Sequence, residues 1–76
     1  MEFDEDKVDD AVLALMFLGI HEEDRTWKGF DWGALDRLHE KGMISNPKGK
    51  AKSVWLTEQG RARSEDLFKK MFGASD

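Results

Sequence analysis

The sequence predicts a small α+β domain built from three helices and one short β-hairpin. Apolar residues recur at helical spacing in three segments, each of which begins after a residue type that caps helices and ends before a glycine. Between the second and third segments, two short apolar runs flank a polar turn, as strands flank the turn of a hairpin. The chain has 76 residues, so we expect a single domain, residues 1–76.

The first helix is expected over residues 4–18. Asp4 is a favourable N-cap residue, and Phe3 and Val8 have the spacing at which apolar side chains pack across a helix start. Gly19 suits the end of this helix. The apolar positions of one face are Val8, Ala11, Val12, Leu15 and Leu18, and the positions that widen it are Leu13, Met16 and Phe17. Because a three-helix domain offers little cover for so wide a face, we expect the widening side chains to mediate self-association, most simply as a homodimer.

The second helix is expected over residues 31–41. Asp31 is its N-cap residue and Gly42 ends it. The preceding residues 21–29 are polar and have no sustained period, which predicts a loop with room for one short turn of helix or strand.

The hairpin is expected over residues 43–56 and is followed by a third helix over residues 57–72. Asn46–Lys52 supplies the turn, because Asn-Pro opens turns and a glycine within it permits positive φ. Strand alternation then directs Val54 inward and Trp55 outward, where an exposed tryptophan indicates an interface or packing under the last helix.

The expected core follows from the consistent apolar face of each element. The side chains that we expect to be largely buried are Val12, Leu15, Leu35, Leu38, Ile44, Leu56, Leu67 and Phe68. Trp27, Phe30 and Trp32 lie within six residues, and in so small a domain we expect them to form the core and its lid; the alternative is a patch that binds a partner.

Composition excludes several classes of protein. The chain has no cysteine, which rules out disulfides and thiolate metal sites. The N-terminal residues are acidic, where a secretory signal would be basic, and the longest apolar run, Ala11–Leu18, is too short to cross a bilayer. We therefore expect a soluble, cytoplasmic protein with no membrane contact.

Charge is unevenly distributed along the chain, whose net charge is −4. Residues 1–24 hold nine acidic residues and one lysine, a local charge of −8, whereas residues 25–72 hold eleven basic and six acidic residues, a local charge of +5; Asp76 adds the last acid. Overall acidity disfavours DNA binding, since phosphate contacts supply most non-specific affinity, and the basic half offsets this only in part.

No residue pattern indicates catalysis. The acids of the first helix, such as Asp6 and Asp10, fit a solvated face better than a catalytic pair, because catalysis needs a pocket that perturbs a pKa. His21 and His39 lack metal-ligand spacing, and the serines have no nearby base. We therefore expect no enzyme activity, no metal, no cofactor and no small-molecule substrate.

The turn of the hairpin carries the strongest signal for binding. Its lysines alternate, so they would present three ammonium groups to one side, and two arginines follow closely in sequence. Arg37, on the expected outward face of the second helix, is the one good candidate for reading a base. The expected binding surface consists of Arg37, Lys48, Lys50, Lys52, Trp55, Arg61 and Arg63.

Residues 35–67 resemble the second half of winged-helix regulators of the MarR and PadR type. The phrases LDRLHEKGMI and VWLTEQGRARSEDL carry this likeness through Leu35, Leu38, Gly42, Ile44, Val54, Leu56, Thr57 and Gly60. The resemblance implies a reduced winged-helix-like domain, in which residues 21–29 are too few for the scaffold helix that DNA-reading members place before the recognition helix. Through WKGFDW and KAKSVWLTEQG, the whole chain also resembles a family of small bacterial proteins of unknown function.

Two functions remain open. The favoured one is a binding module that mediates protein contacts, with a protein partner or with itself, because tryptophan is abundant, the net charge is negative and the scaffold helix is missing. The alternative is a small DNA-binding regulator that uses the basic turn and Arg37, with weak affinity.

Overall fold

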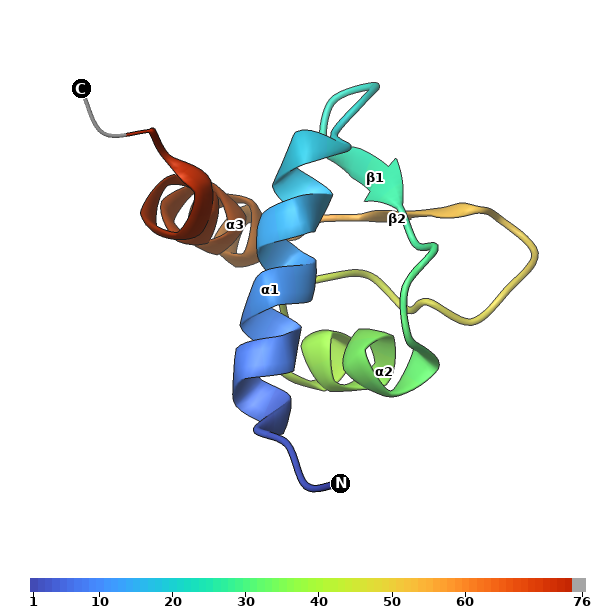
Figure 1. Cartoon of the computed structure of the whole chain (residues 1–76). Helices are drawn as coiled ribbons and strands as arrows, with labels where there is room; N and C mark the ends of the chain where they lie inside the picture. The colour runs from blue at the N-terminus through green and yellow to red at the C-terminus, as the bar shows by residue number, and fades with distance from the viewer. Residues whose placement is uncertain (75–76) are drawn as a thin grey trace.

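The computed structural model describes residues 1–74, so the last two residues of the expected domain, including Asp76, lie outside the described part. It confirms a small α+β fold with three helices and a two-stranded antiparallel sheet (Figure 1). The elements are α1 (Glu5–Leu18), β1 (Arg25–Trp27), α2 (Trp32–Glu40), β2 (Ser53–Trp55) and α3 (Glu58–Phe72).

Each helix begins where its capping residue predicts. The Asp4 carboxylate accepts hydrogen bonds from the backbone N–H groups of Asp6 and Lys7, at 3.0 and 3.2 Å. The carboxylate of Asp31 and the hydroxyl of Thr57 accept equivalent bonds at the starts of α2 and α3. These contacts satisfy backbone donors that have no partner within the helix, which is why such residues mark helix starts.

The strand pairing differs from the expected one. β1 comes from the segment expected as a loop, and it pairs antiparallel with β2, with Thr26 opposite Val54. The segment expected as the first strand of the hairpin meets the chain after β2 only through an isolated bridge between Ile44 and Leu56. Three residues are too few for the alternation of apolar and polar side chains to be recognised in the sequence. In the structure, Thr26 points inward, and its hydroxyl donates a hydrogen bond to the carbonyl of Met16 at 2.7 Å.

Helix α1 lies across the middle of the domain, with α3 on one side and α2 with the sheet on the other (Figure 1). Six of the eight expected core side chains are buried, Phe68 is half-buried, and Leu15 is 40% exposed, so its prediction was wrong. Leu13 and Met16, which we expected to be uncovered, are each 1% exposed, and Phe17 packs on Phe68 with ring centroids 5.4 Å apart. The core face of α1 is therefore rotated from the expected one, because α3 covers the side chains that we assigned to a dimer interface.

The start of α3 is pressed against the chain that follows α2. The Thr57 hydroxyl donates to the Gly42 carbonyl at 2.6 Å while it accepts from the N–H of Gly60. A Cβ atom at Gly60 would overlap the Met43 carbonyl group. Thr57 and Gly60 therefore serve the packing of α3, since only glycine lets this helix approach the backbone at Met43 so closely.

We predict that Gly60→Ala lowers the free energy of unfolding by about 3 kcal/mol, the upper end of what overpacking costs, although alanine has the higher helix propensity. Chemical denaturation would measure the change. Gly29→Ala is the matched control, because a Cβ atom there meets nothing within 4 Å, and it should change stability little. Equal stability of the two variants would contradict the packing role.

Candidate functional site

Two tryptophans that flank the connection from β1 to α2 have most of their surface in solvent. Trp27 ends β1 and is 56% exposed, and Trp32 begins α2 and is 60% exposed. Our prediction that both belong to the core or its lid was wrong; only Phe30 between them packs against the core. Exposed tryptophans so close together are unusual in a small domain and indicate a binding surface.

The local structure of β1 explains why Trp27 faces outward. Thr26 is 1% exposed and is fixed inward by its bond to Met16, so strand alternation directs the next side chain to solvent. The imidazole of His21 supports the indole of Trp27, with ring centroids 5.5 Å apart. The indole is therefore supported by a neighbouring ring although more than half of Trp27 is exposed.

Lys28 joins the tryptophans to the basic loop, which we define as residues 46–52. Its ammonium group donates to the carbonyl of Pro47 at 2.5 Å and to that of Gly49 at 3.1 Å. The same ammonium group lies 5.8 Å from the ring centroid of Trp32, within cation–π range, and the backbone N–H of Lys28 donates to the carbonyl of Lys52 at 3.1 Å. One side chain thus sets the position of the loop relative to Trp32.

The basic loop is anchored at two further points. Pro47 is fully buried, and the Asn46 side chain accepts a bond from the N–H of Lys48 at 2.9 Å, which forms the expected turn. Gly49 has φ +133°, a conformation that other residues rarely adopt. The loop that carries the lysines therefore has a defined path although it contains no helix or strand (Figure 1).

A groove of about 540 Å³ lies between the two tryptophans and the basic loop. Trp27 and Trp32 supply its aromatic walls, Lys50 and Lys52 its basic rim, and Lys28 lies between them. None of the residues that line this tryptophan groove is acidic. Aromatic rings beside exposed ammonium groups suit a ligand that has an apolar or aromatic side chain flanked by negative charges. The rings would bury that side chain, and the lysines would attract the charges beside it.

The other residues of the expected binding surface do not join this groove. Lys48 lies beside a separate polar hollow whose lining includes Asp36 and Glu40. Trp55 is 48% exposed, as strand alternation predicted, and the Arg25 guanidinium lies 5.7 Å from its ring centroid.

Two arginines of α3 lie on the side of the domain where α3 packs against α1. The guanidinium of Arg61 lies 5.2 Å from the ring centroid of Phe17, and Arg63 pairs with Asp10 at 3.6 Å. Their proximity in sequence to the loop lysines is therefore not proximity in space, because α3 leads away from the loop (Figure 1).

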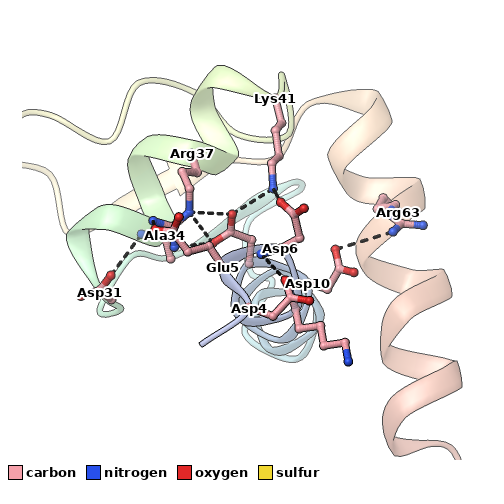
Figure 2. Close-up of polar contacts among 11 residues, drawn as sticks. Asp4, Glu5, Asp6, Asp10, Asp31, Ala34, Arg37, Lys41 and Arg63 are labelled. Carbon is pink, nitrogen blue, oxygen red and sulfur yellow. Dashed lines mark hydrogen bonds and ion pairs between the residues drawn. The ribbon is translucent and has the colours of Figure 1, made fainter. Parts of the chain in front are cut away.

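Arg37 does not face outward as expected. Its guanidinium donates to both carboxylate oxygens of Asp9, at 2.8–3.1 Å, and to Glu5 at 2.8 Å. Lys41, one turn further along α2, donates to Asp9 at 2.9 Å and to Asp6 at 3.1 Å. Figure 2 shows both basic side chains directed from α2 toward the acids of α1. The expected outward direction of Arg37 was wrong, because the buried carboxylate of Asp9 attracts its guanidinium.

Asp9 is the buried centre of this network, with 0% of its side chain exposed. Burial by itself raises the pKa of Asp9, but hydrogen bonds from Arg37 and Lys41 outweigh burial and leave the pKa below the ordinary value of an aspartate. Hydrogen bonding to Asp9 in turn raises the pKa of Arg37 and of Lys41. All three groups are therefore charged at neutral pH, and the network holds α2 against α1.

We predict that Asp9→Asn lowers the free energy of unfolding at pH 7 by about 3 kcal/mol, because it leaves two cations without their buried partner. Since the pKa of Asp9 is lowered on folding, its stabilisation is present above the unfolded value of about 4 and is lost as pH falls through the folded value. The variant should therefore lose part of the acid sensitivity of the wild type in urea titrations between pH 2 and 7.

The matched control is Asp10→Asn, because the carboxylate of Asp10 is 36% exposed and its pair with Arg63 is longer. Its effect should stay below about 1 kcal/mol at every pH. The same loss in both variants would show that the buried network has no special role.

Sequence reasoning placed Lys50 and Lys52 correctly on a surface loop but missed the tryptophans as their neighbours. The available signal was Thr26, a β-branched polar residue that strand alternation could have turned inward. No signal in the sequence pairs Lys28 with the carbonyls of the loop, because that contact joins segments 19 and 21 residues apart.

The part of the chain that the structure describes contains neither a cluster of metal ligands nor a membrane-spanning helix. Within residues 1–74, no three or more histidines and acidic residues come together as metal ligands. Among the helices of the same residues, none has both the length and the apolar character that a bilayer span requires. The expected absence of a metal remains a prediction.

Comparisons with known proteins agree with the expected resemblance to small bacterial proteins of unknown function. Over residues 4–74 the chain matches the family described as a domain of unknown function, DUF6429. "Uncharacterized protein y4hR" of Sinorhizobium fredii (strain NBRC 101917 / NGR234) is 58% identical over 72 residues, which cover 95% of this chain and 97% of that protein. No solved structure matches the chain. The matches span both the tryptophan groove and the Asp9 network.

Proposed function

We propose that this chain, which belongs to the family of the domain of unknown function DUF6429, is a small non-enzymatic binding module that holds an acidic segment of a protein partner. The observation that carries the proposal is the tryptophan groove. Two exposed indoles and two lysines that form no ion pair within residues 1–74 line this groove, and no residue of its lining is acidic. An extended segment with one aromatic or large apolar side chain between acids complements this surface in shape and charge.

The rigidity of the groove supports a binding role. Lys28 and the buried Pro47 hold the basic loop, while the N-cap of α2 holds the start of the helix that carries Trp32. Walls that are already ordered lose little conformational entropy when a ligand binds, which favours affinity in a small contact.

We predict that a short peptide with one phenylalanine between pairs of aspartates binds with a dissociation constant on the order of 100 µM, as expected for so small an interface. Trp55→Phe provides the test protein, because it leaves Trp27 and Trp32 as the only indoles and both line the groove. A saturable change in their fluorescence would report binding. Lys50→Glu combined with Lys52→Glu should weaken it at least tenfold.

The matched control reverses the charge of Lys69 and Lys70, which are exposed on α3 and pair with neighbours one turn away on the same helix. It changes the net charge by the same amount but leaves the groove intact, so peptide affinity should stay within about twofold at moderate ionic strength. An equal loss in both double variants would show that net charge, and not the groove, attracts the peptide.

The basic loop also favours a second candidate function, binding of a DNA backbone. Lys48, Lys50 and Lys52 are exposed and carried on an anchored turn, and residues 35–67 resemble winged-helix regulators. The outward face of α2 opposes this function, because Asp36 and Glu40 are exposed there while Arg37 is held by Asp9.

If the loop binds DNA, its three lysines neutralise about three phosphates, so the log-log dependence of affinity on salt should have a slope near −3. Replacing all three lysines with alanine should flatten that slope and weaken every sequence about equally, since phosphate contacts carry no base information. Anisotropy titrations at low salt would measure both. Duplex binding that is tighter than peptide binding would replace the first candidate function with the second.

A further inference from the structure

We propose that the segment which fills the tryptophan groove is the N-terminal segment of a second copy of this chain, residues 1–4, with Phe3 as the anchor. This inference rests on the proposed function of the groove and identifies its partner. Each contact would then join two different surfaces, the groove of one molecule and the N-terminal segment of another.

The N-terminal segment has the chemistry that the groove complements. Phe3 is 59% exposed, so the packing across the helix start that its spacing predicted leaves most of the ring in solvent. Glu2 and Asp4 flank it, and all residues from Met1 to Lys7 are exposed. An aromatic ring between two acids therefore projects from the acidic end of one molecule, while two indoles and two lysines form a hollow on another surface.

The segment is too short to reach Trp27 of its own molecule. Trp27 lies beside Gly19 at the far end of α1, since a Cβ atom on Gly19 would lie 3.8 Å from the indole. The 14 residues of α1 separate its ends by about 21 Å, whereas residues 1–4 span at most about 14 Å when fully extended. Figure 1 shows the N-terminal segment leaving α1 at the end away from β1. Phe3 therefore cannot reach Trp27 of its own molecule, whereas Phe3 of another copy can contact both tryptophans.

Charge favours the same partner. The arginine and lysine of α2 that lie near the N-terminal acids are already paired with the carboxylates of Glu5, Asp6 and Asp9. Lys50 and Lys52 have no ion-pair partner within the described residues. The contact would therefore join exposed acids of one molecule to exposed lysines of the next, and it should weaken as salt rises.

Sedimentation velocity of the full chain between 10 and 500 µM at low salt tests this inference. We expect reversible growth beyond the monomer, which Phe3→Ala abolishes and Phe3→Trp retains. Trp27→Ala combined with Trp32→Ala should abolish it as well, and Leu18→Ala, at an exposed apolar position of α1, should not. All replaced side chains are more than half exposed, so circular dichroism should show folded proteins.

Mixing two deficient variants tests whether the N-terminal segment of one copy fills the groove of another. The Phe3→Ala protein keeps an intact groove, and the double tryptophan variant keeps an intact N-terminal segment, so each is expected to be monomeric alone. Together they should form a 1:1 complex and nothing larger, because one contact is complete and no second one is available.

Three results would overturn the inference. These are a wild-type protein that stays monomeric at 500 µM, self-association that survives Phe3→Ala, and a mixture of the two variants that stays monomeric. None of them affects the proposed function, because the peptide titration tests the groove separately. Absence of peptide binding would overturn the proposed function, and the variant pattern of self-association would still decide this inference.

Discussion

The contact on which the rest of the structure depends is the one between the buried carboxylate of Asp9 and the two cations of α2. Asp9 lies on the core face of α1, where an unpaired charge would be costly, so Arg37 and Lys41 must reach it from α2. Desolvation of the charged groups offsets much of their attraction, so removing one partner costs more than the intact network contributes to stability. The network fixes how α2 lies against α1, and with it the position of Trp32 at the start of α2.

A second cation plays the corresponding role at the groove. Lys28 has its ammonium group between two backbone carbonyls of the basic loop and within reach of the indole of Trp32. The groove therefore depends on two ordered connections: the Asp9 network positions one wall, and Lys28 positions the basic rim relative to it. Neither connection resembles a binding motif in the sequence, because each joins segments that are far apart along the chain.

In the folded structure, ion pairs between the helices neutralise much of the uneven charge of the chain. Acids of the first 24 residues and bases of the remainder suggest two oppositely charged ends, but much of that charge is neutralised where α1 meets α2 and α3. The lysines at 50 and 52 remain outside these pairs. The surface that is available for a partner is thus smaller than the sequence indicated, and it is defined by aromatic rings as much as by charge.

The sequence by itself determined the fold class, the starts of all three helices, the turn at Asn46–Lys52 and the outward direction of Trp55. These features depend on contacts within a few residues, such as capping bonds and strand alternation, and their signals are local. The tertiary structure decided the partner of β2, the rotation of α1 that buries Leu13 and exposes Leu15, and the direction of the Arg37 side chain toward Asp9. Each of these follows from which surface another element covers, and a helix that is apolar nearly all round does not specify which of its faces will be covered.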